Sequence, residues 1–276
     1  MRVVLRVRPM QVWAGRLSPR SSPALSPEEK FRRLVNAALG TPYYSKPHRA
    51  AALLGAGTLH EVGITPLRDV LDTPAQFENP KKHRRRPEFH APLESKELAV
   101  GGVKLALPRG GREIRNQDLP TLDGSGIGML AAPPPMLRRL CALVEDGSVS
   151  LPCLSEAVVA LGSVVEGGML SGERDMLWRC LGVPVFEQWL GLEGELLAWE
   201  CESHRGMHLN RSSVELEEVG GEWVVTSWEA LRIPVLRMAT GWRGSIQHGK
   251  CICGEDSALL LRGTAVEEMA MAAGAA

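Results

Sequence analysis

The first regular pattern of apolar and polar positions begins near residue 26. Ser26-Pro27-Glu28-Glu29 combines an N-cap residue, a proline suited to the first helical position and two acids at the positive end of a helix dipole. The apolar residues that follow fall on one helical face: Phe31, Leu34, Val35 and Leu39. The pattern predicts a helix that ends at Gly40-Thr41-Pro42, and then two shorter helices over 47–54 and 68–71.

Helical and extended patterns alternate from Met129 onward. Apolar residues at helical spacing predict a helix over 136–144, and the β-branched run 157–165 predicts a strand. A helix over 171–180 and a strand over 183–187 follow. This alternation predicts an α/β fold in which a mostly parallel sheet is flanked by helices.

Strand signals follow one another at short intervals beyond residue 195. They cover residues 196–199, 214–218, 223–226 and 235–238. Closely spaced strands without intervening helices are typical of antiparallel sheets, so a β-rich subdomain is expected here. Residues 88–128 show no clear period and are expected to form a loop-rich connection.

These patterns divide the 276 residues into six segments, a length that suffices for one large domain or two small ones. We expect a poorly ordered lead-in over 1–26, an N-terminal helical segment over 27–80, a basic linker and loop-rich connection over 81–128, an α/β core over 129–195, a β-rich subdomain over 196–263 and a tail over 264–276.

The charge balance limits the classes of partner. Lys+Arg and Asp+Glu are 32 each, which leaves no overall field to attract nucleic acid or an anionic membrane. The dense basic run 81–87 has no interleaved aromatic residues and is expected to be a solvated linker rather than a phosphate contact. We find no secretory signal or membrane-length apolar stretch, and therefore expect a cytoplasmic protein whose six cysteines are free thiols or metal ligands.

Several short phrases occur in a fixed order in the last third of the chain. They are Gly191-Leu192-Glu193-Gly194-Glu195, Glu200-Cys201-Glu202, Gly206-Met207-His208, Gly221-Glu222-Trp223, Pro234-Val235-Leu236-Arg237-Met238-Ala239-Thr240-Gly241 and Cys251-Ile252-Cys253-Gly254. Together with Thr41-Pro42-Tyr43-Tyr44 and Thr65-Pro66-Leu67, they resemble the phenylacetate-CoA ligase family of AMP-forming acyl- and aryl-CoA ligases. The resemblance covers residues 27–80 and 127–263.

The resemblance implies the N-terminal α/β part of an adenylate-forming ligase, and ATP-dependent conversion of an organic acid to its CoA thioester. The partners of an active copy would be the organic acid, ATP with Mg²⁺ and CoA. Gly191 and Glu195 occupy the phrase that contacts the adenylate and its metal, and Thr240 and Gly241 precede the place of a ribose-binding aspartate. We assign these four residues as nucleotide-binding candidates and assign no catalytic residue.

The family pattern is broken at the parts that handle ATP. We find no Gly/Ser/Thr-rich loop with a lysine, and the nearest candidate, Asp123–Gly128, is better interpreted as a turn before Met129. The phosphate-contacting threonine that should follow Gly191 is missing. Trp242 stands in the place of the aspartate, and an indole has no acceptor for ribose hydroxyls. The family's lid domain would begin near Arg262-Gly263, but an Ala/Met-rich stretch follows instead, so no lid is expected.

A cysteine and histidine constellation is better preserved. Some members of the family hold a structural zinc through residues that correspond here to Cys201, His208, Cys251 and Cys253, with His204 as an alternative to His208. Three thiolates and one imidazole suit tetrahedral Zn²⁺. We favour a structural zinc over three free cysteines, and expect no chemistry from it.

Three hypotheses for the function remain open from the sequence, and they leave undecided whether the chain is an enzyme. The first is a truncated, degenerate and non-catalytic homologue of an AMP-forming acid-CoA ligase. The second is a minimal active ligase that a partner chain completes by supplying the lid. The third is a binding or assembly module that uses the β-rich end as a surface for a protein partner.

Overall fold

The computed structural model describes residues 25–83, 87, 98–103, 105, 107, 111–165 and 167–265. Most of the expected lead-in, three residues of the basic run, much of 88–110 and the tail from residue 266 lie outside these ranges. None of the helices within them is long and apolar enough to cross a membrane.

The N-terminal helices confirm the sequence pattern. Helix α1 spans Pro27–Ala38, and its N-cap is a reciprocal capping box in which Glu29 N donates to Ser26 Oγ and Ser26 N donates to Glu29 Oε2. The remaining helical elements of this segment are α2 (Pro47–Gly55), η1 (Leu59–Glu61), α3 (Leu67–Asp72) and η2 (Pro74–Phe77).

A parallel half of the sheet follows, with helices packed on it. Its strands are β1 (Leu98–Gly101), β2 (Arg112–Ile114), β3 (Met129–Ala132), β4 (Ala157–Ser163) and β5 (Val185–Leu190), in the order β2-β1-β3-β4-β5. All four pairings are parallel. The connections contain η3 (Asn116–Leu122), α4 (Pro134–Glu145) and α5 (Glu173–Leu181). The carboxyl ends of these strands therefore meet at one edge, where ligands bind in open parallel sheets.

The two faces of this half are buried in different cores. In β3, Leu130 packs in one core with residues of α4 and α5, whereas Met129 packs in a second core on the opposite face. The same alternation separates Val158 from Val159 in β4. Burial of both faces explains why these strands read as continuous apolar runs rather than as alternating ones.

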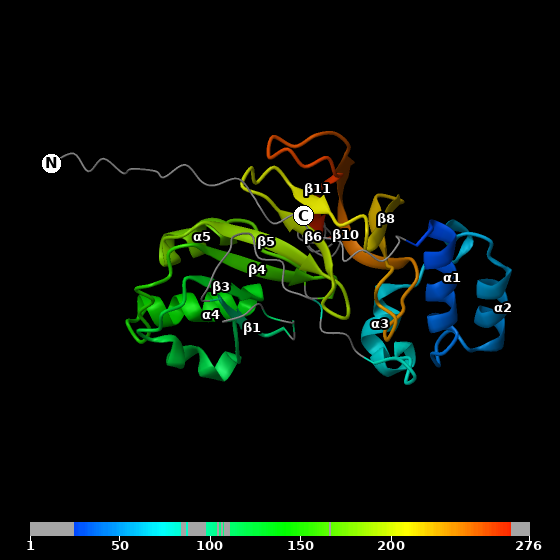
Figure 1. Cartoon of the computed structure of the whole chain (residues 1–276), viewed down its shortest axis with the longest axis horizontal. Coiled ribbons are helices and arrows are strands. Elements are labelled where there is room, and N and C mark those ends of the chain that lie inside the picture. Colours follow the sequence, from blue (N-terminus) through cyan, green and yellow to red (C-terminus); the bar gives the residue numbers. More distant parts are fainter. Residues whose placement is uncertain are drawn as a thin grey trace, which may run out of the picture.

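The antiparallel half continues the same sheet. Strand β6 (Leu196–Glu200) pairs antiparallel with β5, and the order proceeds β6-β7-β11-β10-β9-β8 to complete eleven strands. The other members are β7 (Met207–Leu209), β8 (Val214–Val219), β9 (Glu222–Ser227), β10 (Met238–Gln247) and β11 (Leu259–Ala265). Figure 1 shows the two halves side by side, with the parallel strands among α4 and α5.

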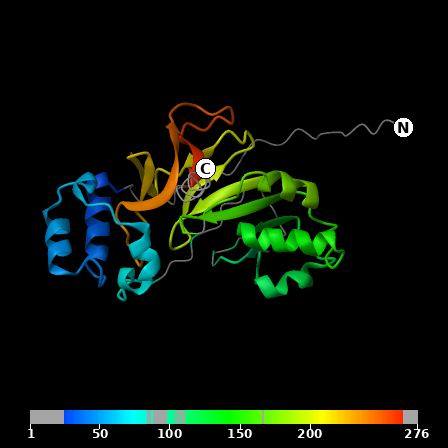
Figure 2. The ribbon, with the colours of Figure 1, turned by 180° about the vertical axis from the view of Figure 1, so that it is seen from behind.

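The N-terminal helices pack on the antiparallel half, far from their sequence neighbours in the parallel half (Figure 2). Leu34 and Phe77 share one core with Trp223 and Leu236. A buried hydrogen bond from Leu236 N to Tyr44 Oη, 3.1 Å long, ties the same regions together. The β-rich half thus depends on residues that lie more than a hundred positions earlier in the chain.

Two expectations about strands are corrected. Residues 235–237 precede β10 instead of belonging to it, because Arg237 has a φ of 47°, which an extended strand does not allow. The guanidinium of Arg237 holds this conformation by bonding to the Glu217 carboxylate and to the Val62 carbonyl. The described part of the expected loop-rich connection contains β1, β2 and η3. Arg262-Gly263, near which the lid domain of the family would begin, lies within β11.

Candidate metal centre and nucleotide site

The four predicted metal ligands form one cluster. Cys201 follows β6, His208 lies in β7, and Cys251 and Cys253 lie on the turn between β10 and β11. Their candidate ligand atoms all lie within 4.8 Å of one another. The antiparallel pairing of β7 with both β6 and β11 brings together residues that are fifty positions apart.

Two of the distances within the cluster fit tetrahedral coordination. Zinc–sulfur bonds of about 2.3 Å and zinc–nitrogen bonds of about 2.0 Å place two sulfurs about 3.8 Å apart, and a sulfur and a nitrogen about 3.5 Å apart. The sulfurs of Cys201 and Cys251 are 3.8 Å apart, and Cys253 Sγ is 3.4 Å from His208 Nε2. The donor set and its spacing therefore fit a divalent cation such as Zn²⁺.

Burial and polar neighbours control the protonation of the cluster. Burial lowers the pKa of His208, whose side chain is 0% exposed, and so favours the neutral imidazole that can bind a cation. Burial acts to raise the pKa of Cys251, but hydrogen bonds from Ser203 and from the Cys253 backbone outweigh it and leave the pKa below its usual value. Burial raises the pKa of Cys253 to about 12, so a cation would have to displace that proton.

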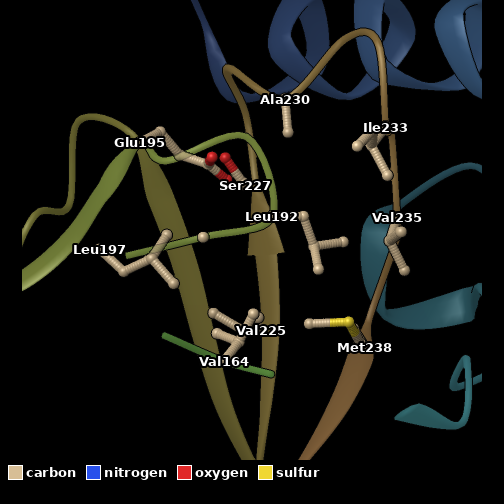
Figure 3. Close-up of a pocket in the computed structure, with 11 residues that line it drawn as sticks. Val164, Leu192, Glu195, Leu197, Val225, Ser227, Ala230, Ile233, Val235 and Met238 are labelled. Atoms are coloured by element: carbon tan, nitrogen blue, oxygen red, sulfur yellow. The ribbon is translucent and has the colours of Figure 1, made fainter. Parts of the chain in front are cut away.

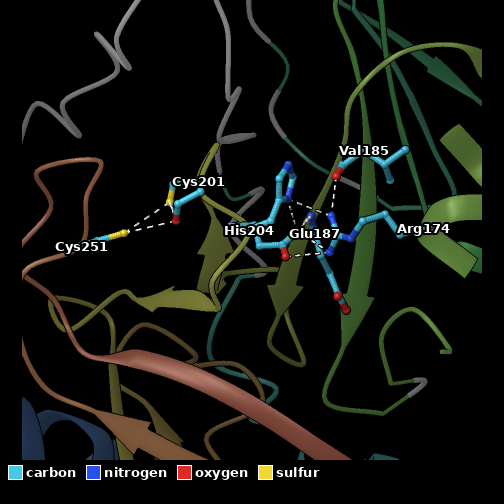
Figure 4. A network of polar contacts seen from close by, with 8 residues as sticks. Arg174, Val185, Glu187, Cys201, His204 and Cys251 are labelled. Atoms are coloured by element: carbon cyan, nitrogen blue, oxygen red, sulfur yellow. Dashed lines mark hydrogen bonds and ion pairs between the residues drawn. The ribbon is translucent and has the colours of Figure 1, made fainter. Parts of the chain in front are cut away.

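His204, the alternative to His208, lies outside the cluster. Its Nδ1 is 3.0 Å from Arg174 Nη1, and its ring stacks on Phe186. Arg174, from α5, donates through Nη2 to both carboxylate oxygens of Glu200. Figure 4 shows the His204 ring in this network, to one side of the Cys201 and Cys251 sulfurs. The network fastens α5 to the start of the turn that carries Cys201.

The nucleotide candidates Gly191 and Glu195 lie together in the turn between β5 and β6. Gly191 N donates to the Glu195 carbonyl, and the Glu195 side chain folds back over Gly191 so closely that a Cβ there would lie 2.0 Å from Oε1. The turn is held in place by Glu193, whose carboxylate accepts from Arg232 N and Ile233 N. A glycine is therefore required at position 191 for a packing reason.

Glu195 lies in a mostly apolar pocket (Figure 3). The pocket has room for about one water molecule. Burial raises the pKa of Glu195 to about 7, and the neighbouring Ser227 hydroxyl and the backbone N–H groups of Glu193 and Glu195 offset it only in part. Ser227 lies beside it in Figure 3, yet Ser227 Oγ makes no hydrogen bond of good geometry among the described residues. The apolar walls include Val164, Leu192, Leu197, Val225, Ile233 and Met238.

Thr240 and Gly241 form a β-bulge in β10. The pairing of β10 shifts register in this region on both sides, and Gly241 has a φ of 73°. Thr240 Oγ1 donates to the Trp223 carbonyl and accepts from Trp242 N. Neither residue lines the pocket of Glu195. The structure therefore does not bring the four nucleotide candidates into one pocket.

Trp242 lies at the edge where the parallel strands end. Gly167 closes a short turn after β4, with Gly167 N donating to the Ser163 carbonyl, and Val164 N bonds to Leu190 O at the end of β5. A Cβ on Gly167 would lie 2.6 Å from Trp242 Cζ2. The indole thus lies against Gly167, just after the carboxyl end of β4.

The Asp123–Gly128 segment is a turn, as the sequence indicated. Gly124 N bonds to the Ser150 carbonyl, and the segment leads directly into the amino end of β3. A phosphate-binding loop instead follows the carboxyl end of a strand. This segment is therefore at the wrong edge of the sheet for that task.

Sequence reasoning missed the polar residues that support the cluster. Ser203 Oγ lies 2.9 Å from Cys201 Sγ and 3.3 Å from Cys251 Sγ, and Ser257 Oγ lies 2.8 Å from His208 Nδ1. The proximity of Ser203 to Cys201 in the sequence was the one available signal. Ser257 is separated from His208 by 49 residues, and only the pairing of β7 with β11 reveals the contact.

Comparison with known proteins identifies the fold. No protein-family model matches the chain, and no curated protein matches its sequence. Among solved structures, 2-hydroxyisobutyryl-CoA ligase in an open conformation with 2-HIB-AMP and CoA matches 85% of this chain and 68% of its own, with a TM-score of 0.62 at 12% identity. The same ligase in the postadenylation state with R3-HIB-AMP matches 90% of this chain and 71% of its own, with a TM-score of 0.63 at 12% identity. The chain has the mixed α/β fold of the N-terminal part of adenylate-forming ligases.

Proposed function

We propose that this chain is a non-catalytic relative of the phenylacetate-CoA ligase branch of adenylate-forming enzymes. It keeps the fold and a structural zinc centre, and it does not bind ATP. The fold similarity to an acyl-CoA ligase supports the general assignment, and the ordered sequence phrases from Gly191 to Gly254 support the branch.

The observation that carries the loss of nucleotide binding is the position of Trp242. Its indole rests on Gly167 at the carboxyl ends of the parallel strands, the edge at which ligands bind in such sheets. The ring fills space there and offers no acceptor for ribose hydroxyls. Thr240 and Gly241, the other residues of the same phrase, are engaged in the bulge that orients this ring.

The environment of Glu195 gives a second, independent support. A carboxylate that binds Mg²⁺ at a nucleotide must be ionised and must reach the phosphates. Glu195 is 4% exposed, has a pKa near 7 and lies in a pocket with room for about one water molecule. Its surroundings suit the core better than an ATP site.

Thermal unfolding with and without ATP-Mg²⁺ tests the proposal. A ligand at about a hundred times its Kd would add about 2.7 kcal/mol to the free energy of unfolding. We expect no shift for the natural chain, together with about one zinc per chain in metal analysis. Trp242→Asp, which removes the ring and supplies a carboxylate, is the informative variant, because a shift found only there would identify the indole as the obstacle.

An active enzyme would give different results. A stabilising shift of the natural chain by ATP-Mg²⁺, or pyrophosphate release that depends on an added organic acid, would contradict the proposal. Either result would favour the minimal ligase, and adding CoA would then test whether the acid is passed to a thiol.

A further inference from the structure

The His208 ring is fixed by a contact on the side opposite the cysteines. Its Nδ1 lies 2.8 Å from Ser257 Oγ, while Nε2 lies 3.4 Å from Cys253 Sγ. His208 is fully buried, and Ser257 is 8% exposed, so water does not readily replace this hydroxyl. A neutral imidazole carries one proton. When that proton is on Nδ1, Nδ1–H donates a hydrogen bond to Ser257 Oγ, and the lone pair of Nε2 is directed toward the cysteines.

The cysteine sulfurs have a hydroxyl of their own. Ser203 Oγ lies 2.9 Å from Cys201 Sγ and 3.3 Å from Cys251 Sγ, so it sits between the two sulfurs that are 3.8 Å apart. Three thiolates and one Zn²⁺ leave a net charge of −1 in a buried place. Such a charge is stabilised by nearby hydrogen-bond donors. The hydroxyl of Ser203 can donate a hydrogen bond to either sulfur.

The two serines come from different loops. Ser203 belongs to the turn between β6 and β7, and Ser257 lies between Cys253 and β11. Each one therefore supports ligands that another part of the chain provides: Ser203 reaches Cys251, and Ser257 reaches His208. These contacts between loops would fix the positions of the ligands before a cation binds.

We infer that Ser203 and Ser257 are the outer-shell positioning residues of the metal centre, Ser257 by orienting the His208 ring and Ser203 by donating to the thiolates. The inference rests on the metal centre of the proposed function. It adds that the affinity for Zn²⁺ and the coordination geometry depend on two hydroxyls that do not touch the cation.

Alanine and threonine variants of the full chain test the inference. Zinc affinity is measured by competition with a chromophoric chelator, and the geometry is measured from the absorption bands of the Co²⁺-loaded protein. We expect Ser203→Ala and Ser257→Ala each to weaken zinc binding by about 10–100-fold. Ser203→Ala should also shift the sulfur-to-cobalt charge-transfer bands. Ser203→Thr and Ser257→Thr keep the hydroxyl and should recover most of the affinity.

Ser245→Ala is the matched control, because Ser245 is an exposed serine of β10 outside the cluster. Affinities and cobalt spectra of both alanine variants equal to those of the natural chain would overturn the inference. If the natural chain itself binds neither Zn²⁺ nor Co²⁺, the metal centre of the proposed function fails, which is a different result. Spectra recorded at saturating Co²⁺ keep the test valid for a variant whose stability is reduced.

Discussion

The four predicted metal ligands lie together in the folded chain and the four nucleotide candidates do not, although both sets were identified from sequence phrases of the same resemblance. All four residues of the cluster converge within 4.8 Å. The nucleotide candidates separate into two pairs, one packed in a turn and one holding a bulge. The donor atoms of Cys251 and His208 lie close to those of the other two ligands, whereas Glu195 Oε2 and Thr240 Oγ1 are bonded to the backbone of Glu193 and Trp223.

The difference shows how much each site demands of the rest of the molecule. A tetrahedral centre needs four donors of the right type at the ends of adjacent strands, and strand pairing alone can supply them. A nucleotide site also needs open space, solvent access and a phosphate loop. A short phrase can also have a packing role that has nothing to do with a nucleotide, as at Gly191, where a Cβ would meet the Glu195 side chain.

Removal of the metal should have the largest effect on this comparison. Free zinc at about a thousand times its Kd adds about 4 kcal/mol to the free energy of unfolding, so a chelator should lower stability by about that amount. Cys251→Ser should abolish the zinc-dependent part, and Cys153→Ser, at an exposed cysteine, should not. Urea unfolding with and without added zinc measures both. If the chelator leaves the unfolding midpoint unchanged, the cluster does not have the structural role that we propose.

The protonation of Glu195 should have the next largest effect. Burial raises its pKa from 4.5 to about 7 in the folded chain. Below pH 4.5 both states are protonated and stability is unaffected; as the pH rises to 7, the unfolded state releases the proton first and the folded state loses stability. The loss amounts to about 3 kcal/mol at pH 7 and above.

Glu195→Gln isolates this effect, because the amide keeps the shape of the side chain and does not titrate. The stability advantage of the variant over the natural chain should be near zero at pH 4.5, and should grow until about pH 7. Urea unfolding at several pH values gives the difference directly. A constant difference across this range would mean that Glu195 is solvated and ionised, as an ATP-Mg²⁺ site requires.

Gly191→Ala distinguishes a packing role from a nucleotide role. The added Cβ would lie 2.0 Å from Glu195 Oε1, and we expect a loss of about 2 kcal/mol in the free energy of unfolding. Shortening the other side chain in Gly191→Ala/Glu195→Ala should recover part of the loss relative to the sum of the two single variants. Gly63→Ala is the control, since nothing lies within 4 Å of its Cβ position. Strict additivity would show that the two residues do not compete for space.

Much of the fold was predictable wherever local signals were strong. The helix at Pro27 has a complete capping box, and the α4-β4-α5-β5 alternation has clear apolar runs. Strands β1, β2, β3 and β7 were missed because three or four residues do not establish a period, and β11 was missed as well. The conformation of Arg237 could not be read locally, since it depends on Glu217 and on the carbonyl of Val62.

The candidate site was predictable to a similar extent and for related reasons. The ligand types and their order identified the metal cluster, but Ser257 entered only through the pairing of β7 with β11. Trp242 was recognisable as a substitution, yet its contact with Gly167 depends on how the antiparallel half meets the ends of the parallel strands. The types of the metal-binding residues could be identified from the sequence, but the packing of side chains around each candidate site could not.

Thr240→Val should lower the free energy of unfolding least among these changes. Valine keeps the shape of threonine but removes the hydroxyl that donates to the Trp223 carbonyl and accepts from Trp242 N. The loss of these buried bonds should lower the free energy of unfolding by about 1–2 kcal/mol. Thr240→Ser keeps the hydroxyl and should retain most of that stability. Urea unfolding measures the cost, and ATP-Mg²⁺ added to each variant shows whether the threonine also serves a nucleotide. If Thr240 only holds the bulge, the unfolding curves should be equal with and without ATP, because its hydroxyl is already bonded to the Trp223 carbonyl and to Trp242 N. An ATP-dependent difference between the serine and valine variants would return Thr240 to a nucleotide site.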